Sequence, residues 1–137
     1  MAMPEVTLGR FVRALCHRMC FESAMLLYLG EDLQKWQALF YVLYRADMPG
    51  KPACISGLEF TPEPTPYSHD VRDAILAIKN DAWHVQPLYD GFYAPTVEAW
   101  ASWVASNMLV EGHARDYLDL ALTLAKELFP TQPKPLY

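Results

Sequence analysis

A chain of 137 residues has the usual length of one domain, and 53% hydrophobic with 20% charged residues is the composition of a globular protein. No apolar run approaches the roughly 18 residues that a membrane-spanning helix needs, so we expect no membrane partner. The net charge of −5 argues against a broad nucleic-acid surface. Because there are three cysteines and the start lacks a signal-peptide pattern, we expect a reduced, cytoplasmic protein.

The first predicted helix begins after Thr7, whose hydroxyl suits an N-cap. Its apolar face has helical spacing and consists of Leu8, Phe11, Val12, Leu15 and Met19. The basic side chains of this helix are Arg10, Arg13, His17 and Arg18. We interpret them as a solvated outer face rather than as a nucleic-acid patch. The next segment, 22–29, contains an unbroken apolar run, which we assign to a short helix before Gly30.

The longest apolar-periodic run, 31–46, predicts the central helix of the domain. From Leu39 to Tyr44 the apolar side chains cover every direction around the helix axis, so we expect other elements to surround this helix. Glu31 and Asp32 suit its start, and the segment 48–50, Met-Pro-Gly, ends it.

Prolines flank the segment 53–60, which therefore predicts an edge strand or an extended arm. Ser68 is suited to cap the following helix, whose apolar face includes Val71 and Ile75 and which ends near residue 80. The Asp90-Gly91 pair, set between two apolar and aromatic dipeptides, predicts a β-hairpin.

Two further helices are predicted after the hairpin. The first opens at Pro95 and Thr96, ends at Gly112, and carries on one face Val97, Trp100, Val104 and Met108. The second covers 114–129, with core spacing at Leu118, Ala121, Leu122, Ala125, Leu128 and Phe129. The fold class predicted is mainly α (α+β): one compact domain, residues 1–129, around a central buried helix with a small β-hairpin or sheet. A Pro-rich extended tail, 130–137, follows.

Few residues offer catalytic or metal chemistry. Cys16 and Cys20 lie one helical turn apart, but two thiolates leave zinc short of ligands, so core packing is favoured. Ser68-His69-Asp70 has triad composition, yet consecutive residues cannot form the relay, and helix capping explains the serine. We therefore expect no enzyme, no metal and no cofactor. A small enzyme that depends on Cys16, Cys20 or His113 remains the alternative.

Aromatic residues in loop and hairpin positions are the most suggestive surface feature. A small domain cannot bury all of Tyr67, Trp83, Tyr89, Phe92 and Tyr93. Because Tyr and Trp are favoured at interfaces, these five are the candidate partner-binding residues. The alternative, that the hairpin covers the central helix and uses these residues as a second layer of core, remains open.

Two pieces of the chain share their pattern with a known family. The first is Leu33-Gln34-Lys35 running into Leu39-Phe40-Tyr41. The second is Gly50-Lys51-Pro52, an extended segment ending in Phe60, then Pro66-Tyr67-Ser68 before the next helix. Over roughly residues 8–93 the chain resembles the Panacea domain family, which includes SocA-like antitoxins and phage-associated GepA-like proteins. Thr65 stands where that family has Gly, and Trp36 replaces its usual aliphatic residue.

The resemblance implies a mostly helical, non-catalytic binding domain that neutralises a toxin or adapts a protein to a protease. The function expected is therefore that of an antitoxin-like or mobile-element accessory protein. Its partner would be another protein: a toxin, a protease adaptor target or a defence component. A phage-encoded inhibitor of a host defence complex has the same small acidic profile and is the alternative.

Overall fold

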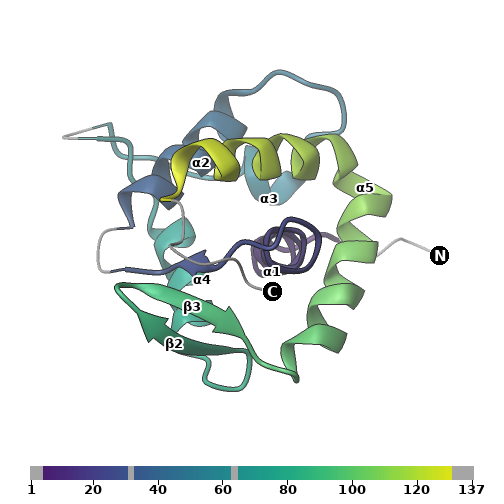
Figure 1. Ribbon diagram of the computed structural model, residues 1–137. Coiled ribbons are helices and arrows are strands. Elements are labelled where there is room, and N and C mark those ends of the chain that lie inside the picture. The colour runs from purple at the N-terminus through teal and green to yellow at the C-terminus, as the bar shows by residue number, and fades with distance from the viewer. Residues whose placement is uncertain (1–4, 31–32, 63–64, 131–137) are drawn as a thin grey trace.

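The computed structural model describes residues 5–30, 33–62 and 65–130. These residues form five α-helices, one π-helical turn and a three-stranded antiparallel sheet, so the mainly α (α+β) class is confirmed. Figure 1 shows α1 (Leu8–His17) almost end-on in the middle, with α5 (Ala99–Leu128) curving around it. Within the described ranges, no helix has both the length and the apolar character to cross a membrane.

Helix α1 forms as the sequence predicts. The Thr7 hydroxyl accepts a hydrogen bond from the backbone N–H of Arg10 at 3.1 Å, and Phe11 and Leu15 are fully buried. The chain continues as a π-helical turn at Arg18–Glu22. The interpretation of the basic residues as one solvated face is wrong for His17 and Arg18, because α5 packs over them.

Helix α2 (Gln34–Arg45) forms one wall of the domain instead of its centre. Trp36, Leu39 and Leu43 are buried, but Val42 is 41% exposed. The expectation that other elements surround this helix on every side is therefore wrong, and α1 takes the central place (Figure 1). The predicted start at Glu31 and Asp32 lies outside the described residues.

The short helix predicted at 22–29 is not formed. The chain leaves the π-helical turn through Ala24, which has a left-handed backbone (φ 53°), and enters β1 (Leu27–Tyr28). Periodicity could not assign this segment because six apolar residues follow one another. Pairing with a strand more than sixty residues later decides its structure.

The strand predicted at 53–60 is also wrong. Residues Ala53–Ser56 form the one-turn helix α3, between Pro52 at its start and Gly57 at its end. Thr61 and Tyr67 then pair through their backbones, and Ser68 caps α4 (His69–Lys79) as predicted, accepting from the N–H of Val71 at 3.3 Å. The backbone pairing of Thr61 with Tyr67 therefore brings the chain from α3 back to the start of α4.

The Gln37 amide ties α2 to the start of α4. It donates to the carbonyl of Ser68 at 2.9 Å and accepts from the N–H of the same residue at 2.8 Å. These two bonds satisfy buried backbone groups at the corner between the helices.

The predicted hairpin is confirmed and gains a third strand. β2 (Val85–Tyr89) and β3 (Phe92–Pro95) join through Asp90 and Gly91, both with positive φ, and the sheet order is β1-β3-β2. Pro87 lies on the edge strand β2, where its missing N–H costs no ladder bond. The sheet lies beside α4, at the lower left of Figure 1.

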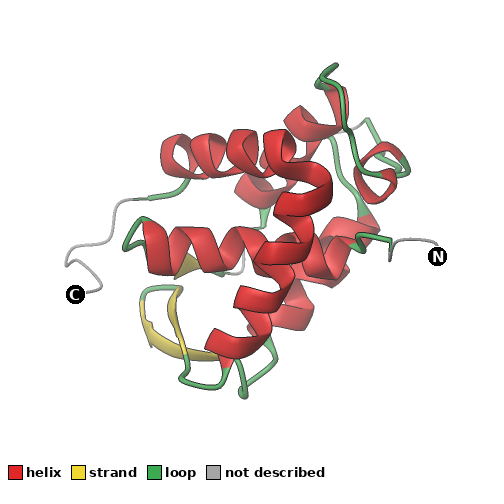
Figure 2. Cartoon of the chain, turned by 90° about the vertical axis from the view of Figure 1, so that its right-hand side faces the viewer, coloured by secondary structure: helices red, strands yellow, loops and turns green. Residues whose placement is uncertain are grey.

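Helix α5 contains both of the helices predicted after the hairpin. Its path changes direction at Ala114 (φ −145°, ψ 38°), two residues after Gly112, where the sequence predicted a break. Figure 2 shows the two halves at a steep angle. Core positions predicted for the second half are confirmed at Leu118, Ala121, Ala125 and Phe129, all buried. The predicted tail beyond residue 130 lies outside the described residues.

Candidate functional site

The first half of α5, together with the turn that leads into it, turns a row of large apolar side chains outward. Val97 is 89% exposed, Trp100 51% and Met108 69%, and Val104, half-buried, lies between the last two. Val97 belongs to the turn, and Trp100, Val104 and Met108 follow at helical spacing on one side of α5, which makes the row about 16 Å long. We call these four residues the apolar strip. Scattered exposed apolar residues are common, but a contiguous row marks a surface that binds something.

The inward side of the same half-helix is partly polar. It buries Ser106 and Asn107 together with Ala99, Trp103 and Val110, and two of the atoms there, Asn107 Oδ1 and Trp103 Nε1, have no hydrogen-bond partner among the described residues. An ordinary surface helix turns its apolar side inward and its polar side to water. Packing within this chain therefore does not explain why Val97, Trp100 and Met108 face outward.

Trp100 is held in place by the aromatic residues beneath it. Its ring lies edge-on to Phe21, with 4.8 Å between the ring centroids, and 5.4 Å from the ring of His17. A half-exposed indole that is already fixed loses little freedom when a partner covers it. Trp is also the residue type most enriched among residues that dominate binding energy.

The turn that carries Trp83 adjoins the beginning of the strip, and Trp83 is 66% exposed. Asp81 fixes its turn: one carboxylate oxygen accepts from the N–H of Trp83 at 3.0 Å, and the other lies 2.5 Å from Nδ1 of His84. The bond with His84 lowers the pKa of Asp81. The hydroxyl of Thr96 donates to the carbonyl of Trp83, which joins this turn to the start of α5.

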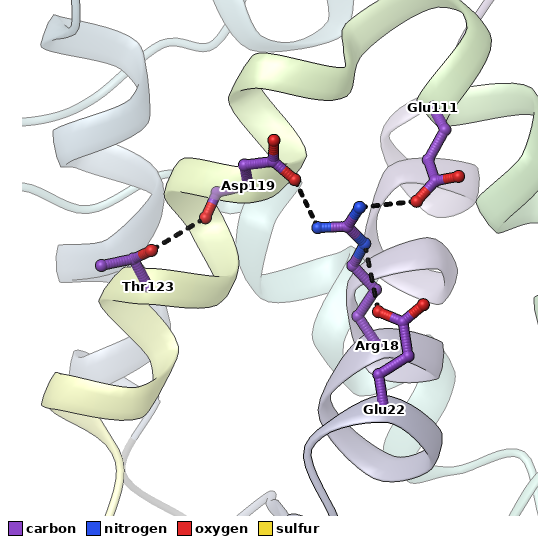
Figure 3. Close-up of polar contacts among 5 residues, drawn as sticks. All are labelled: Arg18, Glu22, Glu111, Asp119 and Thr123. Carbon is purple, nitrogen blue, oxygen red and sulfur yellow. Dashed lines mark hydrogen bonds and ion pairs between the residues drawn. The ribbon is translucent and has the colours of Figure 1, made fainter.

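An acidic cluster lies beyond the other end of the strip. Figure 3 shows the Arg18 guanidinium, 13% exposed, between Glu111 and Asp119, each with an N–O distance of 2.5 Å, and Glu22 at 3.4 Å. Burial acts to lower the pKa of Arg18, but the bonds with Glu111 and Asp119 outweigh it and raise that pKa. Three carboxylates around one guanidinium leave a formal charge of about −2.

The five predicted partner-binding residues are not brought together. Tyr67 lines a groove of about 520 Å³ between α2 and α4, before the start of α4, whereas Tyr93 lies beside Lys79 at the end of α4. The length of that helix, about 16 Å, separates them. Phe92 is 6% exposed and packs with Leu26, so it belongs to the core.

Trp83 and Tyr89 keep exposed rings, while Tyr67 and Tyr93 are half-buried. The role of these residues in partner binding stays a prediction. Among them, Trp83 is the one whose turn adjoins the apolar strip.

The thiols lie in apolar surroundings. Cys16 and Cys20 are fully buried, and burial raises the pKa of Cys16 to about 12 and that of Cys20 well above its usual value. Burial also raises the pKa of Cys54, to about 11. Within the part of the chain that the structure describes, no group of three or more His, Cys, Asp or Glu side chains is arranged to hold a metal ion. At neutral pH these thiols are protonated, the form that is poor as nucleophile and as metal ligand.

The chain matches no protein-family model, no curated protein and no solved structure. The resemblance to the Panacea domain family therefore stays a prediction.

The outward direction of the strip was not foreseen, although the sequence carries a signal for it. From Ala99 to Val110, apolar residues occur in nearly every direction around the helix axis. A helix at the edge of a small domain cannot bury all of these directions.

Proposed function

We propose that this protein is a non-catalytic binding protein that binds another protein through the apolar strip and the neighbouring Trp83. The observation that carries the proposal is the outward row of Val97, Trp100 and Met108 over an inward side that holds Ser106 and Asn107. Covering that row would remove from water the large side chains that intramolecular packing leaves exposed.

The shape of the surface supports a protein partner over a small molecule. Small-molecule sites are concave and enclose most of their ligand, whereas the strip is a ridge along a helix. Its composition, with Trp and Met in the apolar row and acids at the rim, matches that of protein interfaces. The protonated, buried state of Cys16 and Cys20 supports a structural role for these thiols.

The expected biological setting is that of an antitoxin-like or mobile-element accessory protein, as the resemblance of residues 8–93 implies. A phage-encoded inhibitor of a host defence complex would use the same kind of surface. The adjacent genes separate the two settings: a toxin gene favours the first and a group of anti-defence genes the second.

Strip variants compared with a matched control test the proposal. Val97→Glu and Met108→Glu place a charge on the strip at well-exposed positions, and Val42→Glu does the same at the exposed apolar position on α2. We expect wild-type protein and Val42→Glu to recover one stoichiometric partner from the native host, and the double strip variant to lose it. Circular dichroism checks that all three proteins are folded. Equal recovery by the folded double variant would refute binding through the strip.

A further inference from the structure

We propose that the element of the partner that docks on the apolar strip is a basic amphipathic helix, with apolar residues on one side and Lys or Arg along its flanks. This inference rests on the proposed function and names the chemistry of its partner. The charges that border the strip at both ends support this inference.

Each end of the strip is bordered by a carboxylate. Glu98, an exposed residue, follows Val97 directly and is the N-cap of α5. Glu111 lies three residues after Met108, and therefore on the same side of the helix, with its side chain 36% exposed. An apolar row between two acidic ends is complementary to an apolar row between two basic ends.

The Arg18 cluster extends the acidic end. Glu22 and Asp119 lie with Glu111 around the guanidinium (Figure 3). Their side chains are 36–49% exposed, against 13% for that of Arg18, so a partner meets mainly the carboxylates. One positive charge beneath three negative charges cannot neutralise the field that a partner meets. Arg115 and Asp116, which follow at the kink, cancel each other in formal charge.

The dimensions of the strip fit a helix. Its length of about 16 Å corresponds to three turns of a partner helix. Ala101 and Ala105, both exposed, lie beside Trp100 and Val104, and small side chains let the axes of two helices approach closely.

The same charges disfavour other occupants. In a second copy of this chain, acidic ends would meet acidic ends or a neutral row, and like charges across an interface oppose association. An anionic lipid surface would be repelled in the same way. A positively charged helix, by contrast, gains both apolar burial and charge pairing.

A pair of model peptides tests the inference. Each has about 15 residues, enough to cover the strip, and the same leucine face, with lysine elsewhere in one and glutamate elsewhere in the other. We expect the Leu/Lys peptide to bind the full-length protein with 1:1 stoichiometry in calorimetry and at least about tenfold more tightly than the Leu/Glu peptide. Added salt should weaken the Leu/Lys complex.

Two substitutions at one exposed position separate charge from apolar contact. Met108→Lys removes the thioether and adds a positive charge, and should weaken Leu/Lys binding about tenfold more than Met108→Glu does. Val42→Lys on α2 is the control and should leave the affinity unchanged.

Three outcomes would overturn the inference: equal affinity for the two peptides, equal effects of Met108→Lys and Met108→Glu, or a dimer in sedimentation equilibrium that Met108→Lys dissociates. The host-partner experiment is independent of these. If strip variants lose the host partner while the peptides do not discriminate, the basic helix is wrong and the protein-binding function remains.

Discussion

Arg18 holds the first and last helices together through charge. It is fixed by two residues of α5, Glu111 and Asp119, and by Glu22 in its own π-helical turn. Removing the guanidinium would leave three carboxylates facing one another at a partly buried interface.

We predict that Arg18→Met, which keeps most of the apolar stem, lowers the free energy of unfolding by about 2 kcal/mol, less than for a fully buried pair because the carboxylates are partly exposed. Urea denaturation measures this change. Arg10→Met, on the exposed side of α1, is the control and should stay within about 0.5 kcal/mol of wild type. If both variants unfolded at the same urea concentration, the Arg18 cluster would contribute nothing to the free energy of unfolding.

His17 makes stability depend on pH. It is buried between Phe21 and Trp100, and burial lowers its pKa below 6.5; Glu22 and Glu111 oppose that shift, whereas Arg18 adds to it. The folded state therefore binds a proton less readily than the unfolded state. The stability that neutral His17 confers is complete above pH 6.5 and is lost as the pH falls through the lowered pKa.

We predict that His17→Leu flattens the decline of unfolding free energy below pH 6.5. Denaturant titrations on both sides of that pH measure the slope. His69→Gln changes an exposed histidine and should retain the wild-type slope. A wild-type slope in His17→Leu would show that other groups set the pH dependence.

At the scale of elements, two glycines differ in whether a larger side chain could replace them. A Cβ on Gly112, inside α5, would meet no atom within 4 Å, whereas a Cβ on Gly91 in the hairpin turn would lie 3.2 Å from the Cα of Gly30. Gly91 also has a φ of +82°, which disfavours any other residue.

We predict that Gly112→Ala raises the free energy of unfolding by about 0.5–1 kcal/mol, because alanine reduces the freedom of the unfolded chain and suits a helix. Gly91→Ala should lower it by more than about 1 kcal/mol through strain. Thermal unfolding of the two variants compares them directly. Destabilisation by Gly112→Ala would show that the bend of α5 depends on this glycine.

The elements that the sequence predicted correctly are those with local signals. The Thr7 and Ser68 caps and the Asp90-Gly91 turn depend only on neighbouring residues, and all three are formed. The helix predicted at 22–29 is wrong because the apolar run of this segment has no period, and pairing with the distant strand β3 determines its structure. At 53–60 the Pro52 and Gly57 pair was a helix signal that the strand assignment overlooked.

The candidate surface was only partly predictable, for a related reason. An excess of exposed aromatics was expected, and Trp83 is indeed exposed. Which side of α5 faces outward depends on how α1 packs against it, and a helix that is apolar on every side carries no local information on that choice. Phe92 was misjudged because β1, an unforeseen strand, brings Leu26 and Tyr28 to its ring.

At the scale of the whole molecule, the end of α5 closes the domain onto α2. Phe129 is buried, and its ring centroid lies 4.5 Å from that of Trp36. Tyr117, in the second half of α5, donates to the carbonyls of Ala46 and Met48 and so fixes the chain just after α2.

We predict that Phe129→Ala lowers the free energy of unfolding by about 3 kcal/mol, the usual cost of a cavity left by a buried phenylalanine. Lys126→Ala, exposed on the last turn of the same helix, should change it by less than about 0.5 kcal/mol. Tryptophan fluorescence during urea unfolding reports the loss. A shift of equal size in both variants would mean that α5 ends without a specific contact.

The enclosure of α1 by α5 has a consequence for synthesis. Arg18 and Asp119 are 101 positions apart, so the first helix leaves the ribosome long before the residues that cover it. At the usual 5–20 residues per second, its apolar face waits about 5–20 seconds for that cover. During this interval the side of α1 that α5 covers in the folded protein is open to chaperones, and a chain that stalls before Ala99 lacks that cover.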